Sequence, residues 1–373
     1  MSESAGESGS GGGRITSIDA LRGFDMMLIV GGREAILGLT LAFGLDRTHE
    51  VLLGQFEHPA WNGFTAWDMI FPLFLFLAGA SLPFSFAKRR ERGDSRKRLA
   101  LHAVRRGLVL ALLGVVYNGL LALDLESLRV ASVLGRIGLA WAGAALVVLF
   151  LGVRGQAIAL AAVLLAHSVA ILFVPAPGLD AASLEPGQTF GDWVDRQLTP
   201  GRLYKGDRDP EGVFGILPAI GTALLGSFAG RWIGRRELSD GARLGGLVGG
   251  GIACLALGGA LDLAGLPINK NLWTASFVLW AGGWSLLLLA LFHFVFDVRR
   301  ADRLALVFTV VGANAILAYL AGAFIDVRDV VELVMGRGLE RGKLHPALVP
   351  VLALALQWAV LAFLYRRRVF LRV

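Results

Sequence analysis

A histidine and two carboxylates stand close together before an apolar run, in the segment QFEHPAWNGFTAWDM. Near neutral pH an imidazole can take a proton from an attacking amine or hydroxyl and return it to a leaving thiolate. His58 therefore fits a catalytic base, which either Glu57 or Asp68 could orient. The simpler interpretation is a membrane interface, where Trp61 and Trp67 anchor the segment, His58 is inert and Asp68 caps a helix.

Charged residues also occur inside segments that are otherwise apolar. Asp19, Arg22 and Asp25 are spaced three residues apart, which places them on about one face of a helix. An aspartate or arginine at the centre of a membrane helix costs about 2.5–3.5 kcal/mol, so such residues should face the bundle interior and pair with each other. They form either a structural clamp or a site for a polar ligand. Arg136, within another apolar run, requires an anionic partner for the same reason.

Nine basic residues lie between positions 88 and 106. Membrane topology and anionic lipid headgroups are sufficient to explain such a loop. The alternative is that Arg105 and Arg106 bind the phosphates of a nucleotide-like donor, because arginine binds phosphate in a bidentate manner. No Walker loop or GxGxxG motif accompanies these residues, so a P-loop NTPase or a Rossmann domain is not indicated.

The elements that must position these residues are apolar and numerous. Hydrophobic residues make up 55% of the 373 residues and charged residues 17%, whereas soluble domains have about 25% charged residues. The predicted fold class is an all-α polytopic membrane protein with about ten transmembrane helices, each of roughly 20 residues. The expected spans are about 18–44, 67–86, 105–123, 132–151, 156–174, 213–233, 244–263, 272–296, 304–324 and 348–365.

Lysine and arginine residues are distributed unevenly between the two sets of loops. The set that includes both termini holds 22 of the 36, and the opposite set holds 11. The positive-inside rule then places both termini in the cytoplasm and the chain in the inner (plasma) membrane, and it explains the net charge of +7 without nucleic acid. Residues 1–14 are expected to form a disordered cytoplasmic tail and residues 15–373 a single transmembrane domain. Because Cys254 is the one cysteine, no intramolecular disulfide and no cysteine zinc site are expected.

Six segments occur in a fixed order along the chain: SIDALRGFDM, EHPAWNGFTAWDMIFPLFLFLAGASLPFS, SVLGRIGLAW, DPEGVFGILPAIGTALLG, PINKNLWTASFVL and VGANAILAYL. In this order they resemble the heparan-alpha-glucosaminide N-acetyltransferase family, and the chain is most similar to its bacterial branch. The family's animal enzyme moves acetyl from cytosolic acetyl-CoA to the terminal glucosamine of heparan sulfate across the membrane, and its catalytic histidine opens an HxxWNG motif. The resemblance implies this role for His58. Further expected substrate contacts are Trp61, Asn62, Lys270 and Asn271.

These patterns together predict a transmembrane acyltransferase that carries acyl, in the simplest case acetyl, from cytoplasmic acyl-CoA to an extracytoplasmic sugar or amino sugar without a metal. His58 would be the base or a transient acyl carrier, with Asp68 as its orienting group. The other expected partners are membrane lipid and a second copy of the chain. Charged residues expected to contact substrate are Asp19, Arg22, Asp25 and Arg136.

Two other classes of function remain open on sequence alone. Intramembrane charges and broken helices also suit a secondary transporter for a small anionic or sugar substrate. A non-catalytic membrane partner of a glycan-export system would not need His58. The identity of the acceptor, and the choice between direct attack and an acyl-imidazole route, do not follow from one sequence.

Overall fold

The computed structural model describes residues 15–124, 128–340 and 345–371, and within these ranges the regular structure is helical. Arg129 and Gly201 form an isolated antiparallel β-bridge within these ranges. The predicted all-α class is confirmed, whereas the expected tail over 1–14 lies outside the described residues. The helices are α1 (Thr16–Met27), η1 (Leu28–Gly32), α2 (Arg33–Ala42), α3 (Asp46–Gln55), η2 (Ala66–Met69), α4 (Ile70–Ala80), α5 (Leu82–Glu91), α6 (Arg96–Tyr117), η3 (Leu120–Ala122), α7 (Val133–Phe150), α8 (Val153–Phe173), α9 (Phe190–Leu198), α10 (Ile216–Ile233), α11 (Asp240–Leu263), α12 (Ala275–Phe292), η4 (His293–Val298), α13 (Asp302–Ala313), α14 (Ala315–Ala321), α15 (Val327–Glu340), η5 (Pro346–Leu348) and α16 (Val349–Arg366).

Eight helical segments in the described ranges are long and apolar enough to cross a membrane, or nine if the bent pair α13 and α14 is one span. Ten were expected. The expected span 18–44 is missing from both counts, and the expected span 304–324 is counted only if α13 and α14 form one span. The segment 18–44 is interrupted at Gly31, whose φ of 151° is accessible to glycine and unfavourable for other residues, so α1 and α2 are not one straight span. The second interruption is at Asn314, where α13 and α14 meet at 60°.

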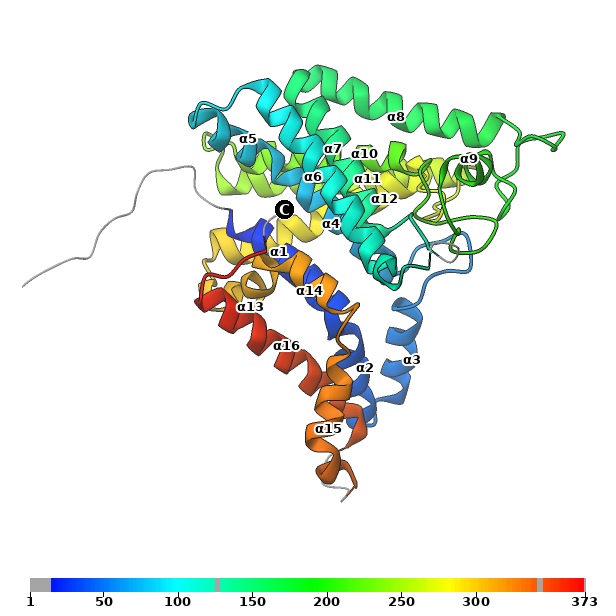
Figure 1. Cartoon of the computed structure of the whole chain (residues 1–373). Coiled ribbons are helices and arrows are strands. Elements are labelled where there is room, and N and C mark those ends of the chain that lie inside the picture. Colours follow the sequence, from blue (N-terminus) through cyan, green and yellow to red (C-terminus); the bar gives the residue numbers. More distant parts are fainter. Residues whose placement is uncertain (1–14, 125–127, 341–344, 372–373) are drawn as a thin grey trace, which may run out of the picture.

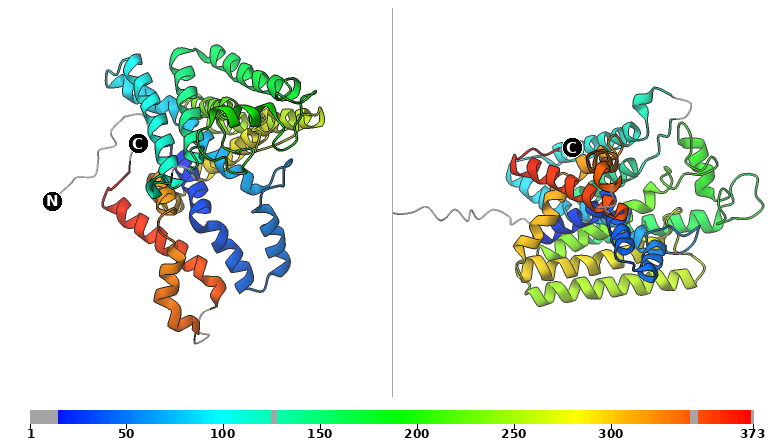
Figure 2. Two further views of the ribbon diagram at one scale, coloured as in Figure 1. Left: turned by 45° about the vertical axis from the view of Figure 1, so that its right-hand side comes forward. Right: turned by 90° about the horizontal axis from the view of Figure 1, so that it is seen from below.

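The centre of the bundle is the contact between α4 and α10. In each of the two spans that contain these helices, 67% of the residues in the most apolar stretch are buried. The corresponding share is 22% for α8 and 17% for α11. Gly79 on α4 lies against the backbone of Ala223, and Gly226 on α10 lies against the carbonyl of Phe76, so closely that a Cβ at either glycine would overlap the opposite helix. Helices α11 and α12 lie side by side at the edge, as the view from below shows (Figure 2).

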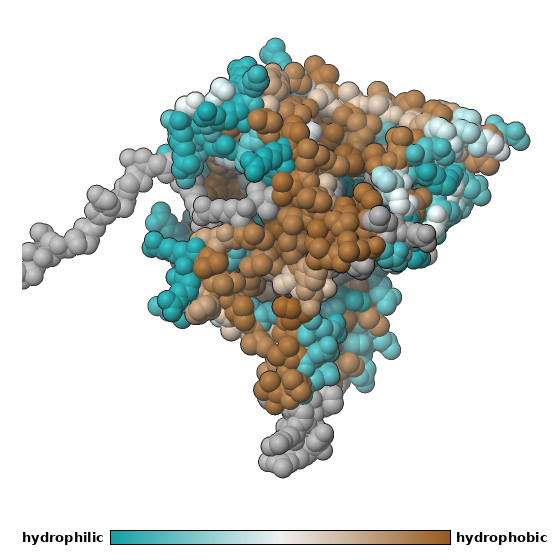
Figure 3. Space-filling model, viewed as in Figure 1, coloured by the Kyte–Doolittle hydropathy of each residue, from teal (hydrophilic) through white to brown (hydrophobic). Residues whose placement is uncertain are grey.

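The two ends of the bundle carry different polar elements. Helix α5 lies toward the left of Figure 1, as do the start of α1 and the carboxyl end of α16, whereas α9 and its neighbouring loops lie toward the right. Figure 3 shows hydrophilic residues at both of these ends and a hydrophobic band between them. This is the surface distribution expected for a bundle that spans a bilayer.

Candidate active site

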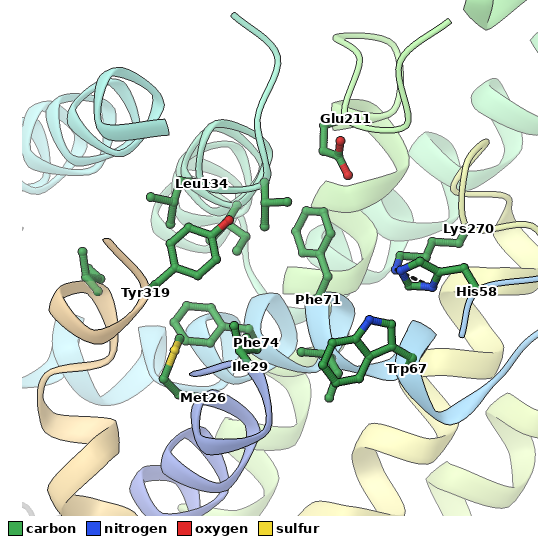
Figure 4. A pocket seen from close by; sticks show the side chains of 14 residues that line it. Met26, Ile29, His58, Trp67, Phe71, Phe74, Leu134, Glu211, Lys270 and Tyr319 are labelled. Carbon is green, nitrogen blue, oxygen red and sulfur yellow. Dashed lines mark hydrogen bonds between the residues drawn. The ribbon is translucent and has the colours of Figure 1, made fainter. Parts of the chain in front are cut away.

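A cavity of about 200 Å³ lies between α1, η1, α4, α7 and α14 and the loops at one end of the bundle. Its polar groups gather toward that end, where His58, Lys270 and Glu211 line it, and it extends past apolar side chains to Met26 and Tyr319 (Figure 4). Both interrupted helices contribute to the wall, because Ile29 lies in η1, and Ile316 and Tyr319 lie in α14. The cavity therefore joins a polar outer end to the apolar interior of the bundle.

His58 and Asp68 form a close pair at the polar end of this cavity. The His58 Nδ1 lies 2.7 Å from Asp68 Oδ1, and the imidazole is half-exposed, whereas the carboxylate is buried. A carboxylate can only accept hydrogen bonds, so Nδ1 carries the hydrogen and donates it to Asp68. The lone pair of a neutral His58 is then on Nε2, which is the arrangement a general base requires.

The Asp68 carboxylate is itself held by Thr65, through the cap that begins η2 and α4. Thr65 N donates to Asp68 Oδ2 at 3.1 Å, and the Thr65 hydroxyl donates to the carbonyl of Glu57 at 2.7 Å. The T-x-x-D spacing is that of a capping box, in which the first and fourth side chains bond each other's backbone. This cap ties the start of α4 to the chain immediately before His58, so the pair is fixed by local structure. Of the two carboxylates considered for orienting His58, Asp68 is the one in contact.

Lys270 completes the cluster from a loop that is distant in sequence. Its Nζ lies 3.3 Å from His58 Nε2 and 3.4 Å from Asp68 Oδ1. The loop is attached to the His58 segment because the buried Asn269 donates its side-chain amide to Asn62 Oδ1 at 2.9 Å, and Gly63 N donates to the Ile268 carbonyl at 2.9 Å. Burial lowers the pKa of Lys270, and the neighbouring Asp68 carboxylate opposes this shift.

Three of the predicted substrate contacts do not line this cavity, and two of them hold neighbouring loops together. Trp61 donates its Nε1 to the Leu184 carbonyl at 2.9 Å, and Asn62 bonds Asn269, so both hold neighbouring loops together. Asn271 lines a second, smaller cavity of about 20 Å³ and does not line the first. The structure thus places these residues beside the site rather than on its surface.

Arg136 is buried in α7 and faces the second cavity. Its Nη2 donates to the Gly212 carbonyl at 2.9 Å, and its guanidinium lies 5.2 Å from the centre of the Trp273 ring. Among the described residues no carboxylate forms an ion pair with Arg136, and its Nε and Nη1 have no hydrogen-bond partner. Glu211 and Asp195 are close enough to attract its charge, and Asp195 also lines this cavity. Burial raises the pKa of Asp195 to about 6. Arg136 supports the loop that carries Glu211 and does not reach His58's cavity.

Of the three charged residues expected to pair on one face of α1, two do so. Arg22 Nη1 donates to Asp19 Oδ1 at 3.2 Å, and Nη2 donates to the Ser81 hydroxyl at 2.6 Å. Asp25 does not join this pair: it is fully buried, and both carboxylate oxygens lack a hydrogen-bond partner among the described residues. The expected clamp is therefore an Asp–Arg pair, and a helical turn separates it from Met26 in the cavity wall.

The two arginines predicted to bind the acyl-CoA donor, Arg105 and Arg106, point in different directions. Arg105 is exposed, whereas Arg106 points into the bundle, with its guanidinium 4.3 Å from the centre of the Trp141 ring. The buried Arg106 Nε has no hydrogen-bond partner among the described residues, and Arg106 is close enough to Arg22 for the two charges to repel each other. Two guanidinium groups thus lie together near the end of the bundle that is opposite His58.

Several cavity residues were not selected from sequence. Glu211 belongs to a DPEG segment that suggested only a helix cap; Arg129 pairs with it and with Asp209, to which Arg129 Nε donates at 2.8 Å. Tyr319 lies in the family segment VGANAILAYL but was not singled out as a site residue. Thr65 could have been found, because the capping-box spacing to Asp68 is visible in the sequence. The described residues contain no cluster of three or more histidine, cysteine, aspartate or glutamate side chains suited to a metal ion.

Comparison with known proteins gives one consistent result. Residues 14–245 match the sequence profile of a family described as heparan-alpha-glucosaminide N-acetyltransferase, catalytic. Over 420 aligned residues the chain is 24% identical to the Mus musculus heparan-alpha-glucosaminide N-acetyltransferase, covering 98% of this chain and 61% of that protein. It is 25% identical to the Homo sapiens protein of the same name over 419 residues, covering 96% and 60%. The chain thus spans about three fifths of the length of these relatives.

Proposed function

Since the chain belongs to the heparan-alpha-glucosaminide N-acetyltransferase family, we propose that it is a transmembrane acyltransferase. It moves an acyl group, in the first instance acetyl, from acyl-CoA on the cytoplasmic side to a sugar or amino sugar on the other side. The observation that carries this proposal is the contact of His58 with Asp68 and Lys270 at the polar end of an otherwise apolar cavity. A positioned base at the end of a largely apolar cavity suits acyl transfer, because the base is fixed beside a space that excludes most water.

In the proposed reaction His58 Nε2 takes the proton of the acceptor's amine or hydroxyl as that atom attacks the acyl carbonyl carbon. The carbon–sulfur bond of the thioester breaks, and His58 returns the proton to the leaving thiolate. Asp68 holds the Nδ1 hydrogen and stabilises the imidazolium that forms. The same geometry serves a second route, in which His58 Nε2 attacks first and carries the acyl group as an acyl-imidazole.

The donor's phosphates would lie at Arg22 and Arg106. Arg22 pairs with Asp19, whereas the buried Nε of Arg106 has no hydrogen-bond partner among the described residues, so an anion would complete the hydrogen bonding of Arg106. Met26 lies one helical turn beyond Arg22, about 6 Å along α1, and lines the cavity. A long, narrow acyl carrier would therefore extend from the two arginines through the cavity to His58.

The distribution of charge supports the sidedness of this reaction. The basic segment 88–106 and the start of α1 lie at one end of the bundle, and α9, with the loops near His58, lies at the other (Figure 1). By the positive-inside rule the basic end is cytoplasmic, which puts both termini in the cytoplasm, the chain in the inner membrane and His58 outside. The acceptor would meet Glu211 and Lys270 at the outer mouth of the cavity.

The proposal is tested by incubating the purified protein with radiolabelled acetyl-CoA and a panel of sugars, including glucosamine and its neutral counterpart glucose. We expect labelled sugar from the unaltered chain and none from His58→Ala. His49→Ala is the matched control, because His49 bonds the Thr40 hydroxyl on α2 and does not line the cavity. Activity in His58→Ala equal to that of the control would contradict the proposed mechanism.

A secondary transporter is the second candidate, and one observation favours it. Both interrupted helices line the cavity, and broken helices commonly form transporter substrate sites. Proteoliposomes without acyl-CoA distinguish the two functions. A transporter would accumulate labelled glucosamine or glucose under these conditions, whereas the proposed acyltransferase would not.

A further inference from the structure

Lys270 lies directly beside the proposed base. Its Nζ is 3.3 Å from His58 Nε2 and 3.4 Å from His58 Nδ1, and it lines the same cavity as the imidazole (Figure 4). Because Nζ is almost equidistant from the two ring nitrogens, it lies over the face of the imidazole and not along the in-plane lone pair of Nε2. A rotation of the Lys270 side chain toward the ring edge would bring Nζ to the distance of about 2.6–3.2 Å from Nε2 at which a nucleophile gives its proton to a base.

The position of Lys270 is enforced by its loop. Asn269, immediately before it, is fully buried and bonds Asn62 in the His58 segment. Asn269 Oδ1 also accepts the Leu272 backbone N–H at 2.9 Å, which closes the turn around Lys270. The side chain of Lys270 is 19% exposed, so little water reaches the amine. The amine is therefore held beside the base in the folded protein without any ligand.

Lys270 also differs in environment from the other lysines that the structure describes. Lys88, Lys97 and Lys205 are exposed, whereas the side chain of Lys270 is 19% exposed. Burial lowers the pKa of Lys270, so a larger fraction of its amine is neutral. A neutral amine next to a general base is the usual activated form of a lysine nucleophile.

We propose that Lys270 is a self-acylation site, which takes the acyl group from acyl-CoA when no sugar occupies the cavity. This inference rests on the proposed acyltransferase function. The neutral Nζ attacks the thioester carbonyl carbon, a carbon–nitrogen bond forms and the carbon–sulfur bond breaks. His58 Nε2 takes one of the two amine protons and passes it to the departing thiolate, so the products are free thiol CoA and an amide on Lys270. No oxidant or further reactant is needed.

Acylation of Lys270 would inactivate the enzyme. The amide has no positive charge, so the contact with Asp68 Oδ1 is lost, and the added acetyl group fills part of the 200 Å³ cavity beside His58. A sugar bound beside His58 would protect Lys270, because it would fill the space through which the acyl group must reach the lysine amine. The site would therefore limit its own use of acyl-CoA when the acceptor is scarce.

The test uses the full chain in detergent with acetyl-CoA alone, followed by mass spectrometry of the peptide that contains Lys270. We expect acetylation at Lys270 to exceed that at Lys205, which is exposed and reports purely chemical acetylation. Removing the base in His58→Ala should slow Lys270 acetylation about 100-fold. A sugar that the protein acetylates should slow it in proportion to cavity occupancy. Protein incubated first with acetyl-CoA should lose sugar acetylation in proportion to the acetylated fraction of Lys270.

The failures of the two proposals can be told apart. If sugar is acetylated while Lys270 stays unmodified, or is modified no faster than Lys205, self-acylation is wrong and the acyltransferase function stands. Equal Lys270 acetylation in His58→Ala would identify a chemical side reaction and would also overturn the inference. If neither sugar nor Lys270 is acetylated, both proposals fail.

Discussion

The change Asp68→Asn removes one charge at the site and alters little else in shape. In the structure Asp68 accepts the His58 Nδ1 hydrogen at 2.7 Å and the Thr65 backbone N–H at 3.1 Å, one on each carboxylate oxygen. An asparagine offers one carbonyl oxygen for these two donors, and its amide group must face the other. If the amide faces His58, it stabilises the tautomer with hydrogen on Nε2, which cannot act as a base.

The size of the effect follows from these two contacts. Loss of a hydrogen bond to a charged group costs about 1.5–3 kcal/mol, which corresponds to a rate decrease of about 10-fold to 150-fold. Where the equivalent change in a serine protease forces the wrong histidine tautomer, kcat falls by about 10⁴. Because the buried Asp68 is the carboxylate that accepts the His58 Nδ1 hydrogen, we expect a decrease in kcat of about 10²–10⁴. The KM for acetyl-CoA should change little, because Asp68 contacts the imidazole, whereas Arg22 contacts Asp19 and Ser81 and Arg106 contacts Trp141.

The assay is the initial rate of sugar acetylation as a function of acetyl-CoA concentration, with melting temperature in detergent as a check on folding. Glu57→Gln is the matched control, since it makes the same change of charge next to His58, and Glu57 has an exposed side chain, whereas Asp68 is the carboxylate bonded to the imidazole. The control should retain near-normal kcat. A folded Asp68→Asn variant with kcat within threefold of the unaltered chain would refute the role of Asp68.

Three further changes test other parts of the account. Arg106→Ala should raise the KM for acetyl-CoA about 10-fold or more with kcat retained, whereas the surface change Arg98→Ala should not; equal effects would exclude a specific donor site. Burial raises the pKa of Asp195 to about 6, so the folded state loses stability as pH rises from about 4 through 6. Asp195→Asn should remove up to about 3 kcal/mol of that loss. The melting temperature of the unaltered chain should therefore fall relative to that of the variant between pH 4.5 and pH 7.5, and a difference in melting temperature that is the same at both pH values would contradict this. Gly31→Ala should destabilise by about 1–3 kcal/mol, because its φ is 151°; an unchanged melting temperature would contradict this.

The fold class was predictable because it depends on composition and apolar length, which are summed over many residues. The helical class and the family suggested by the six motifs are both confirmed. The number of spans was harder to predict from the sequence, because the interruption at Gly31 depends on one backbone angle that packing decides. A glycine pair at this position equally suits an ordinary helix end, so sequence alone does not distinguish a kink from a terminus.

The candidate site was predictable where its contacts are local in sequence. His58 and Asp68 are ten residues apart and bond each other directly. The capping box that holds Asp68 joins it to Thr65, and its spacing can be read in the sequence. Lys270 is 212 residues from His58, and only the family motif indicated it. Glu211 and Tyr319 enter the cavity through a loop and a bent helix, so their place depends on tertiary packing rather than on any local pattern.

The central claim is that acyl passes through the bundle from one side of the membrane to the other with His58 as the reacting group. The most direct measurement uses proteoliposomes with labelled acetyl-CoA sealed on the side of the basic 88–106 segment and a membrane-impermeant amino sugar on the opposite side. The account predicts labelled sugar on the opposite side, and none with His58→Ala. Product that forms only when both substrates are on the same side, or that persists in His58→Ala, would contradict it.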